Sequence, residues 1–208
     1  MITTRETTPE RIVISFTDVV SSTPPFVPPQ FQVESVRSDL AINKIEIPKP
    51  PLGKLPPRLR RLYTDAESVT SGLAKSAFIR VKTLEGSPPN LYQIEYYIRG
   101  IESIQGNNII YRNNHVAEIR LTSEYPRQAP ACRLLTPIFH PNFEPAHICI
   151  GDHWTAQERL IDLIIRIGEM IAYQSYNVKS PLDGEAAKWA DLHQHILPID
   201  RTDLILLE

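Results

Sequence analysis

The sequence contains few cysteines, no long apolar run and almost no net charge, and each absence excludes a class of protein. Two cysteines among 208 residues make no disulfide framework, and a reducing cytosol disfavours the alternative of a bridge between Cys132 and Cys149. No apolar run reaches the roughly 18 to 20 residues that a membrane span needs. The formal charge of −2 gives no reason to expect nucleic acid or an anionic membrane as the main partner.

The division of the chain follows from its length and from where its prolines lie. The first ten residues are polar and lack the apolar centre of a secretion signal, so we expect a cytoplasmic protein. Prolines crowd the first quarter of the chain, and each removes a backbone donor that a helix or a central strand needs. We predict a proline-rich N-terminal extension over residues 1–55, one domain over residues 56–198 and a C-terminal tail over residues 199–208.

One segment of the extension has the pattern of a strand. Within Arg11–Val20, Ile12, Ile14 and Phe16 alternate with other residues. The extension has little core of its own, so we expect it either to lie along the domain or to remain mobile.

A helix is expected to begin at Pro56 and Pro57, where a missing backbone N–H costs nothing. Apolar residues then recur at steps of three and four as far as an end near Ser76; they are Leu59, Leu62, Ala66, Val69 and Leu73. Arg58, Arg60 and Arg61 lie off this stripe. They are either a solvated basic start to the helix or a docking face for an acidic partner.

From residue 78 the apolar period falls to about two. Four strands are predicted: Phe78–Leu84, Tyr92–Arg99, His115–Thr122 and Ala131–Ile138. Loops rich in Gly, Pro and Asn separate them, at Glu85–Asn90, Gln105–Asn114 and Ser123–Pro130. Short connections between sequential strands favour a four-stranded antiparallel meander, and the fold class is therefore α+β.

Two more helices are predicted after this sheet. The first follows Trp154, with Thr155 and Glu158 in the register of a capping box, and is apolar nearly all round, so it should be the central buried helix. A polar loop over residues 180–183 then leads to a shorter helix over Glu185–His195.

The candidate functional stretch lies between the last strand and the central helix. It contains a turn, His140-Pro141-Asn142, and a cysteine seven residues beyond the asparagine, Cys149. A thiolate is a strong nucleophile, and its thioester stays reactive toward amines, so this loop suits acyl transfer. Cys132 alternates among apolar strand residues and is expected to be a core residue.

These motifs, in this order, resemble the E2 ubiquitin-conjugating family over Pro56–Leu197. The resemblance is carried by Tyr125-Pro126, His140-Pro141-Asn142, Ile148-Cys149-Ile150, Trp154, and Ser180-Pro181-Leu182-Asp183 with Glu185-Ala186-Ala187 after it. It implies the UBC-like fold, in which the meander packs on a central helix between an N-terminal helix and a short C-terminal helix. It also implies a ubiquitin-like modifier held as a thioester on Cys149, an E1-like activating enzyme that supplies it and a protein substrate that receives it. No metal and no organic cofactor is implied.

Three departures from the family pattern resemble the E2-like proteins of bacterial ubiquitin-like conjugation systems. The segment between Asn142 and Cys149 is short, one short helix follows residue 184, and the proline-rich extension is added. A role in a bacterial conjugation or antiphage defence operon is a hypothesis that rests on these departures.

The resemblance also implies roles for single residues around the thiol. Asn142 is either a donor to the oxyanion of the tetrahedral intermediate or a clamp that orders the loop of Cys149. His140 is expected to be a hydrogen-bonded turn residue, and Pro141 fixes that turn. The remaining motif residues are Trp154 and Pro181, and Arg58, Arg60 and Arg61 are candidates for docking the activating enzyme.

The acceptor amine must lose a proton, and the groups that handle it are open. Ser180 occupies the position where the family has an acidic or hydroxyl residue that helps. Asp183 or Asp152 supplies a charge in one interpretation, whereas in another Asp183 caps the following helix. His147 and His153 are either proton shuttles or ordinary surface histidines.

Three other functions fit this sequence less well than acyl transfer does. A zinc site formed by His140, His147, Cys149 and His153 matches no familiar spacing. A non-catalytic E2-like variant that only binds a ubiquitin-like protein typically lacks the cysteine. A cysteine hydrolase would need a separate Cys, His and Asn or Asp constellation, and none stands out.

Overall fold

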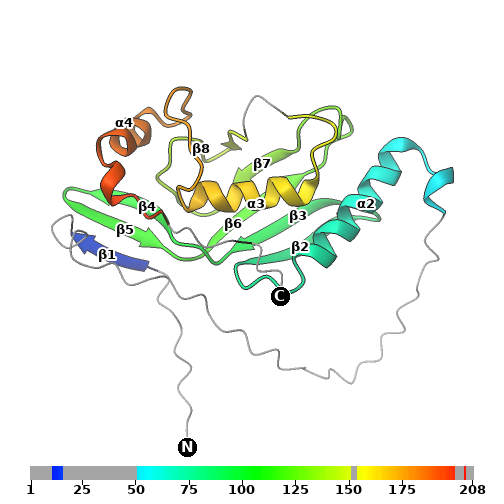
Figure 1. Cartoon of the computed structure of the whole chain (residues 1–208), viewed down its shortest axis with the longest axis horizontal. Helices are drawn as coiled ribbons and strands as arrows, with labels where there is room; N and C mark the ends of the chain where they lie inside the picture. Colours follow the sequence, from blue (N-terminus) through cyan, green and yellow to red (C-terminus); the bar gives the residue numbers. More distant parts are fainter. Residues whose placement is uncertain (1–10, 16–50, 151–153, 200–203, 205–208) are drawn as a thin grey trace, which may run out of the picture.

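One apolar helix crosses a four-stranded antiparallel sheet and forms the main core (Figure 1). The computed structural model describes residues 11–15, 51–150, 154–199 and 204. The strands of the sheet lie in the order β2-β3-β6-β7, and their bounds are β2 Ile79–Gly86, β3 Pro89–Tyr96, β6 His115–Arg120 and β7 Ala131–Leu134. The expected α+β fold, with four antiparallel strands and a central helix, is confirmed.

The central helix, α3 (Leu160–Ile171), is buried along most of its length, because nine of its twelve residues lie in the core. It approaches the sheet closely: the Tyr96 hydroxyl donates to the Ile164 carbonyl at 2.9 Å. At Gly168 a Cβ would lie only 2.8 Å from Cδ1 of Leu204. Leu204 belongs to the predicted tail, and its side chain therefore packs into the main core.

The start of α3 differs from the prediction. Thr155 and Glu158 do not cap it, since it begins at Leu160 after Arg159, which makes no side-chain cap. Instead the Leu160 N–H donates to the Asp65 carboxylate at 3.4 Å. Asp65 lies in α2 (Pro57–Gly72), which ends one turn before the predicted Ser76. A buried carboxylate from another helix thus replaces the local capping box.

Asp65 also joins α2 to the loop before β7. It accepts hydrogen bonds from the Tyr125 hydroxyl at 2.5 Å and from Nε of Arg61 at 2.7 Å. Asp65 as a whole is 2% exposed, so these partners satisfy a carboxylate that would be costly to bury alone. This one residue therefore fixes how α2, α3 and the Tyr-Pro loop meet.

A second sheet corrects the prediction of a loop over Gln105–Asn114. Strands β4 (Gly100–Gln105) and β5 (Asn108–Arg112) form a hairpin, turning at Gly106, whose φ is 58°. β1 (Arg11–Ser15) pairs antiparallel with β5, so the order is β1-β5-β4. The apolar run of β5 is short and lies beside a turn rich in Gly and Asn, so the sequence predicted a loop there. The predicted N-terminal strand is confirmed over Arg11–Ser15, and its remainder lies outside the described residues.

The last helices lie over this second sheet, at the opposite end of the molecule from α2 (Figure 1). α4 (Gly184–Leu192) matches the predicted shorter helix, and a 3₁₀ turn, η2 (Gln194–Ile196), follows it. Another 3₁₀ turn, η1 (Leu52–Lys54), precedes α2. Among the described residues, no helix combines the length and the apolar character that a bilayer crossing requires.

Candidate active site

A two-residue hairpin brings Cys149 back beside Asn142. β8 (Phe143–Glu144) pairs with β9 (His147–Ile148), with Phe143 opposite Ile148. The residues just outside this pair then face each other, and the Cys149 N–H donates to the Asn142 carbonyl at 2.9 Å. Strands this short carry no periodicity, so the sequence did not predict them. The hairpin therefore brings Asn142 and Cys149, which are seven residues apart in the sequence, into direct contact.

The two cysteines lie in different environments. Cys149 is free and partly exposed, whereas Cys132 is free and buried at 3% exposure. Burial raises the pKa of the Cys132 thiol to about 12, so that thiol stays protonated. Of the two, Cys149 is the thiol that an incoming acyl group can reach, and the core position expected for Cys132 agrees with its burial.

The side chain of Asn142 is occupied at both ends. Its Nδ2 donates to the Asn177 carbonyl at 2.9 Å, and its Oδ1 accepts from the Asn177 N–H at 2.7 Å. Asn142 is 3% exposed. Of the two roles predicted for Asn142, oxyanion donor and clamp, the geometry is that of a clamp. Sequence reasoning missed Asn177, because a backbone partner 35 residues away leaves no local pattern.

The same turn also holds the segment that leads into α4. The Pro141 carbonyl accepts from the Leu182 N–H at 2.8 Å and from the Asp183 N–H at 3.0 Å. We call residues 177–183 the gate loop. It is therefore fixed at its start by the side chain of Asn142 and at its end by the carbonyl of Pro141.

His140 is a fully buried part of this turn. Its Nδ1 accepts from the Asn142 N–H at 3.1 Å, and its ring lies against Phe143 and Tyr173, at centroid distances of 4.8 and 4.5 Å. Burial lowers the pKa of His140 to about 3. The ring is consequently neutral near pH 7, and its proton is on Nε2.

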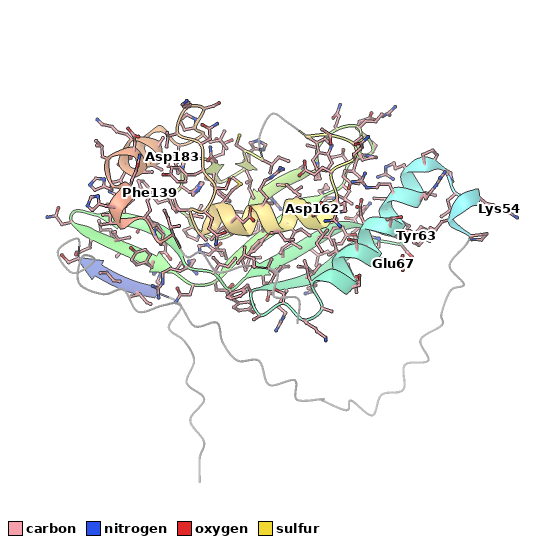
Figure 2. The ribbon with its side chains drawn as sticks, viewed as in Figure 1. Lys54, Tyr63, Glu67, Phe139, Asp162 and Asp183 are labelled. Carbon is pink, nitrogen blue, oxygen red and sulfur yellow. The ribbon has the colours of Figure 1, made fainter. Side chains whose placement is uncertain are left out.

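Phe139 and Tyr173 support the His-Pro-Asn turn, although the sequence predicted no role for either residue. The Tyr173 hydroxyl donates to the Phe139 carbonyl at 2.6 Å, and the Phe139 N–H donates to the Ile101 carbonyl at 2.7 Å. Phe139 packs edge-on against Trp189 of α4, at a centroid distance of 5.9 Å, and Figure 2 labels it at this end of the molecule. The turn thus rests on the second sheet and on α4.

Ser180 and Pro181 are exposed in the gate loop, and Asp183 caps α4. Oδ1 of Asp183 accepts from the N–H groups of Glu185 and Ala186, both at 2.9 Å. The helix-cap interpretation of Asp183 therefore describes its main contacts. Asp152 and His153 lie outside the described residues.

A groove with a volume of about 810 Å³ runs beside the gate loop. Its walls come from the end of β7, from β8 and from the start of α4. The lining residues are Arg133, Leu134, Leu135, Thr136, Pro137, Ile138, Phe143, Glu144, Pro145, Leu182, Asp183 and Gly184. The groove is therefore lined by residues on both sides of the His-Pro-Asn turn and by the end of the gate loop.

The three arginines of α2 divide into two kinds. The Arg61 guanidinium contacts Asp65, the Tyr125 hydroxyl and the carbonyls of Ala156 and Glu158. Nη2 of Arg58 donates to the Thr122 carbonyl at 2.9 Å. Arg60 alone of the three is exposed.

Trp154 and the histidines have separate environments. Nε1 of Trp154 donates to the Pro126 carbonyl at 2.8 Å, and its ring lies 5.8 Å from that of Tyr125. His140 is buried while His147 is exposed, so these two members of the zinc alternative do not share an environment. In the parts of the chain that the structure describes, no three His, Cys, Asp or Glu side chains gather as a metal site would require.

Comparisons with known proteins agree with this geometry. The family model described as "Ubiquitin-conjugating enzyme" matches residues 63–195. The chain is 30% identical over 104 residues to the "Probable ubiquitin-conjugating enzyme E2 L460" of Acanthamoeba polyphaga mimivirus, a match that covers 47% of this chain and 61% of that relative. The chain thus spans about three fifths of the length of that curated relative.

Two solved structures are also similar. One is a ubiquitin conjugating enzyme E2 domain from Toxoplasma gondii, 17% identical, with a TM-score of 0.47 over 66% of this chain and 90% of that chain. The other is titled "Novel Ubiquitin-Conjugating Enzyme" and is 20% identical, with a TM-score of 0.48 over 66% of this chain and 88% of that chain.

Proposed function

The chain belongs to the ubiquitin-conjugating enzyme family, and on that premise we propose that it carries ubiquitin or a ubiquitin-like modifier as a thioester on Cys149. The modifier would then pass to an amine of a protein substrate. The observation that carries this proposal is the partly exposed Cys149, whose backbone N–H is held by the carbonyl of Asn142.

The first step is an exchange between two thioesters. The Cys149 thiolate attacks the carbonyl that joins the modifier's C-terminus to a cysteine of the activating enzyme. A tetrahedral intermediate forms, the bond to the activating enzyme's sulfur breaks, and that sulfur leaves as a thiolate. ATP is consumed upstream by the activating enzyme, so the step needs no cofactor bound to this chain.

The second step is attack by a substrate amine on the Cys149 thioester. A lysine with a pKa of about 10.4 is protonated at pH 7, and removing its proton costs about 4.6 kcal/mol. We place this acceptor in the groove beside the gate loop, which Asp183 lines, and Ser180 lies three residues earlier in the same loop. Asp183 would attract the ammonium, which would give up one proton to solvent water before the amine attacks the thioester carbonyl. The tetrahedral intermediate would then lose a second proton to water, the bond to Sγ would break, and Cys149 would leave as a thiolate.

Asn142 acts in this proposal by fixing the gate loop against Cys149, because its amide already bonds to Asn177. His140 and Pro141 hold the turn, Pro181 stiffens the gate loop, and Trp154 is held by its hydrogen bond to the Pro126 carbonyl.

Docking of the activating enzyme is proposed for α2, at the end of the molecule opposite α4. Figure 2 labels Tyr63 and Glu67 on this helix. Arg60 is exposed there, while Arg58 and Arg61 are held by contacts within the chain. We therefore assign the partner contact to Arg60, and to Arg58 and Arg61 the role of shaping the surface around it.

The direct test is reconstitution with candidate activating enzymes, modifiers and ATP. The wild-type chain should form an adduct that reductant removes. Cys149→Ser should form a reductant-resistant oxyester, and Cys132→Ala is the matched control that should charge normally. A wild-type chain that binds a modifier without ever forming an adduct would instead be a non-catalytic binding module.

We further propose that the protein acts in the cytoplasm, in a bacterial conjugation or antiphage defence system. The short segment between Asn142 and Cys149 and the added N-terminal extension support this. Neighbouring genes test it, because a modifier and an activating enzyme should be encoded nearby, and their absence would count against the proposal.

A further inference from the structure

Strand β1 comes from the N-terminal extension and joins the rest of the protein at the edge of the second sheet. All five of its residues pair with β5, from Arg11 opposite Arg112 to Ser15 opposite Asn108. Its side chains alternate: Ile12 and Ile14 pack against the core of that sheet, while Val13 is 62% exposed. The strand therefore has one partly buried apolar face and an opposite face on which Val13 is exposed.

An ion pair adds to this docking at one end of the strand. The guanidinium of Arg11 contacts both carboxylate oxygens of Glu102, 91 residues away, with Nε at 2.9 Å from Oε2. Nε of Arg112 donates to the same carboxylate at 2.7 Å. Glu102 is 8% exposed and follows Ile101, whose carbonyl holds the N–H of Phe139.

The core that β1 completes also contains the side chains around the clamp. We call it the second core; it comprises Ile101, Ile109, Tyr111, Tyr173, Ala190, Ile196 and Leu197, with Ile12, Ile14, Ile104, Phe139, Tyr176, Val178 and Trp189 packed against it. Tyr176 and Val178 stand on either side of Asn177, the residue that Asn142 clamps. Phe139 directly precedes the His-Pro-Asn turn. Both partners of the clamp therefore rest on the core that β1 covers.

We propose that β1 is a positioning element for transfer from Cys149: by covering the second core it holds Tyr176 and Val178, and so keeps Asn177 within reach of Asn142. The inference rests on the proposed function. Ile12 and Ile14 do not belong to the main core under α3, so losing their contacts should loosen the gate loop while the four-stranded sheet stays folded. Loading of Cys149 through α2 should persist, and the later transfer to an amine should slow.

The test uses three full-length variants of β1. Ile12→Asp/Ile14→Asp places charges on the buried face, Val13→Asp places one on the exposed face as a matched control, and Ile12→Val/Ile14→Val is the conservative rescue. Each is charged by the activating enzyme and then chased with free lysine in a single turnover. We expect Ile12→Asp/Ile14→Asp to charge normally but to discharge about tenfold more slowly, the effect of misplaced reacting groups. The other two should match the wild-type chain.

A second readout does not depend on activity. Hydrogen exchange at the Asn177 N–H should accelerate in Ile12→Asp/Ile14→Asp, while amides in β3 and β6 stay protected. If that variant melts as a whole, the single change Ile14→Ser replaces it. Discharge within about twofold of wild type, or unchanged exchange at Asn177, overturns the inference. If the wild-type chain never charges, the proposed function fails, and exchange at Asn177 still decides whether β1 holds the clamp.

Discussion

Asn142 and Asn177 form a closed pair of hydrogen bonds, in which the side-chain amide of the first takes both backbone groups of the second. Because Asn142 also accepts the Cys149 N–H through its carbonyl, one residue joins the nucleophile to the gate loop. The asparagine of the His-Pro-Asn turn is thus a structural junction in this protein.

Replacing Asn142 should cost stability as well as transfer. Asn142→Ala removes both hydrogen bonds to the backbone of Asn177, which is itself exposed, so the expected cost is about 0.5–1.5 kcal/mol for each bond lost. Thermal melting beside single-turnover discharge measures the two effects. A pure oxyanion donor would instead lose about 100- to 1000-fold in rate with no loss of melting temperature.

Asn142→Asp is the matched control for that change. It keeps the oxygen that accepts from the Asn177 N–H but turns a carboxylate oxygen toward the Asn177 carbonyl. We expect a loss of stability no smaller than that of Asn142→Ala, since two acceptors then face each other. A variant as stable as wild type would contradict the clamp.

The two thiols should differ in reactivity. Under native conditions iodoacetamide should label Cys149, which is partly exposed, and leave Cys132 untouched, because burial keeps that thiol protonated and inaccessible. Unfolding in denaturant should expose both. Peptide mass mapping reads out the sites, and native labelling of Cys132 ahead of Cys149 would contradict the assignment of the nucleophile.

Acid should destabilise the fold through two buried histidines. Burial lowers the pKa of His140 to about 3 and that of His115 to about 4, from an ordinary value of 6.5. The unfolded chain therefore takes up protons first, and stability is lost as the pH falls from about 6.5 toward 4. From pH 7 to pH 5 the two together should cost about 4 kcal/mol.

Denaturant titrations across this pH range measure the slope of stability against pH. His140→Asn removes one of the two groups while its Oδ1 can still accept the Asn142 N–H, so the slope should fall by about half. An unchanged slope in His140→Asn would show that His140 does not contribute to the loss of stability in acid.

The contact between Gly168 and Leu204 should appear as a coupling. Leu204→Ala removes a buried side chain, at a cost of about 2–5 kcal/mol. Gly168→Ala places a Cβ 2.8 Å from Cδ1 of Leu204, a steric conflict that should cost about 1–3 kcal/mol. The double variant should be less destabilised than the sum of the single ones, because each change relieves the other. Strict additivity in denaturant melts would contradict the docking of Leu204.

The sequence predicted the main sheet and the helices, because these elements have apolar patterns within short stretches of the chain. The four strands of the main sheet follow from an apolar spacing of about two residues, α2 follows from apolar steps of three and four, and α3 follows from a segment that is apolar nearly all round. The order of the motifs led to Cys149 and Asn142. The β4–β5 hairpin was missed because Gly106 and its asparagine neighbours have the composition of a loop. The cap on α3 and the clamp on Asn177 were missed because each joins residues far apart in the sequence, such as Asp65 and Leu160.

The role of Ser180 stays a prediction. Its position before Pro181 carries the expectation, and its exposure leaves its hydroxyl open to an incoming substrate. Ser180→Ala should slow discharge to a protein substrate more than charging, if the hydroxyl helps the acceptor amine lose its proton. If Ser180→Ala is charged and discharged at the same rates as the wild-type chain, Ser180 takes no part in the transfer.

Mass spectrometry of the charged protein tests the central claim most directly. After incubation with the activating enzyme, modifier and ATP, the chain should gain the mass of one modifier less one water, on the peptide that contains Cys149. The gain should vanish in Cys149→Ala and remain in Cys132→Ala. A modifier mapped to any other residue, or an adduct that survives in Cys149→Ala, would contradict the account.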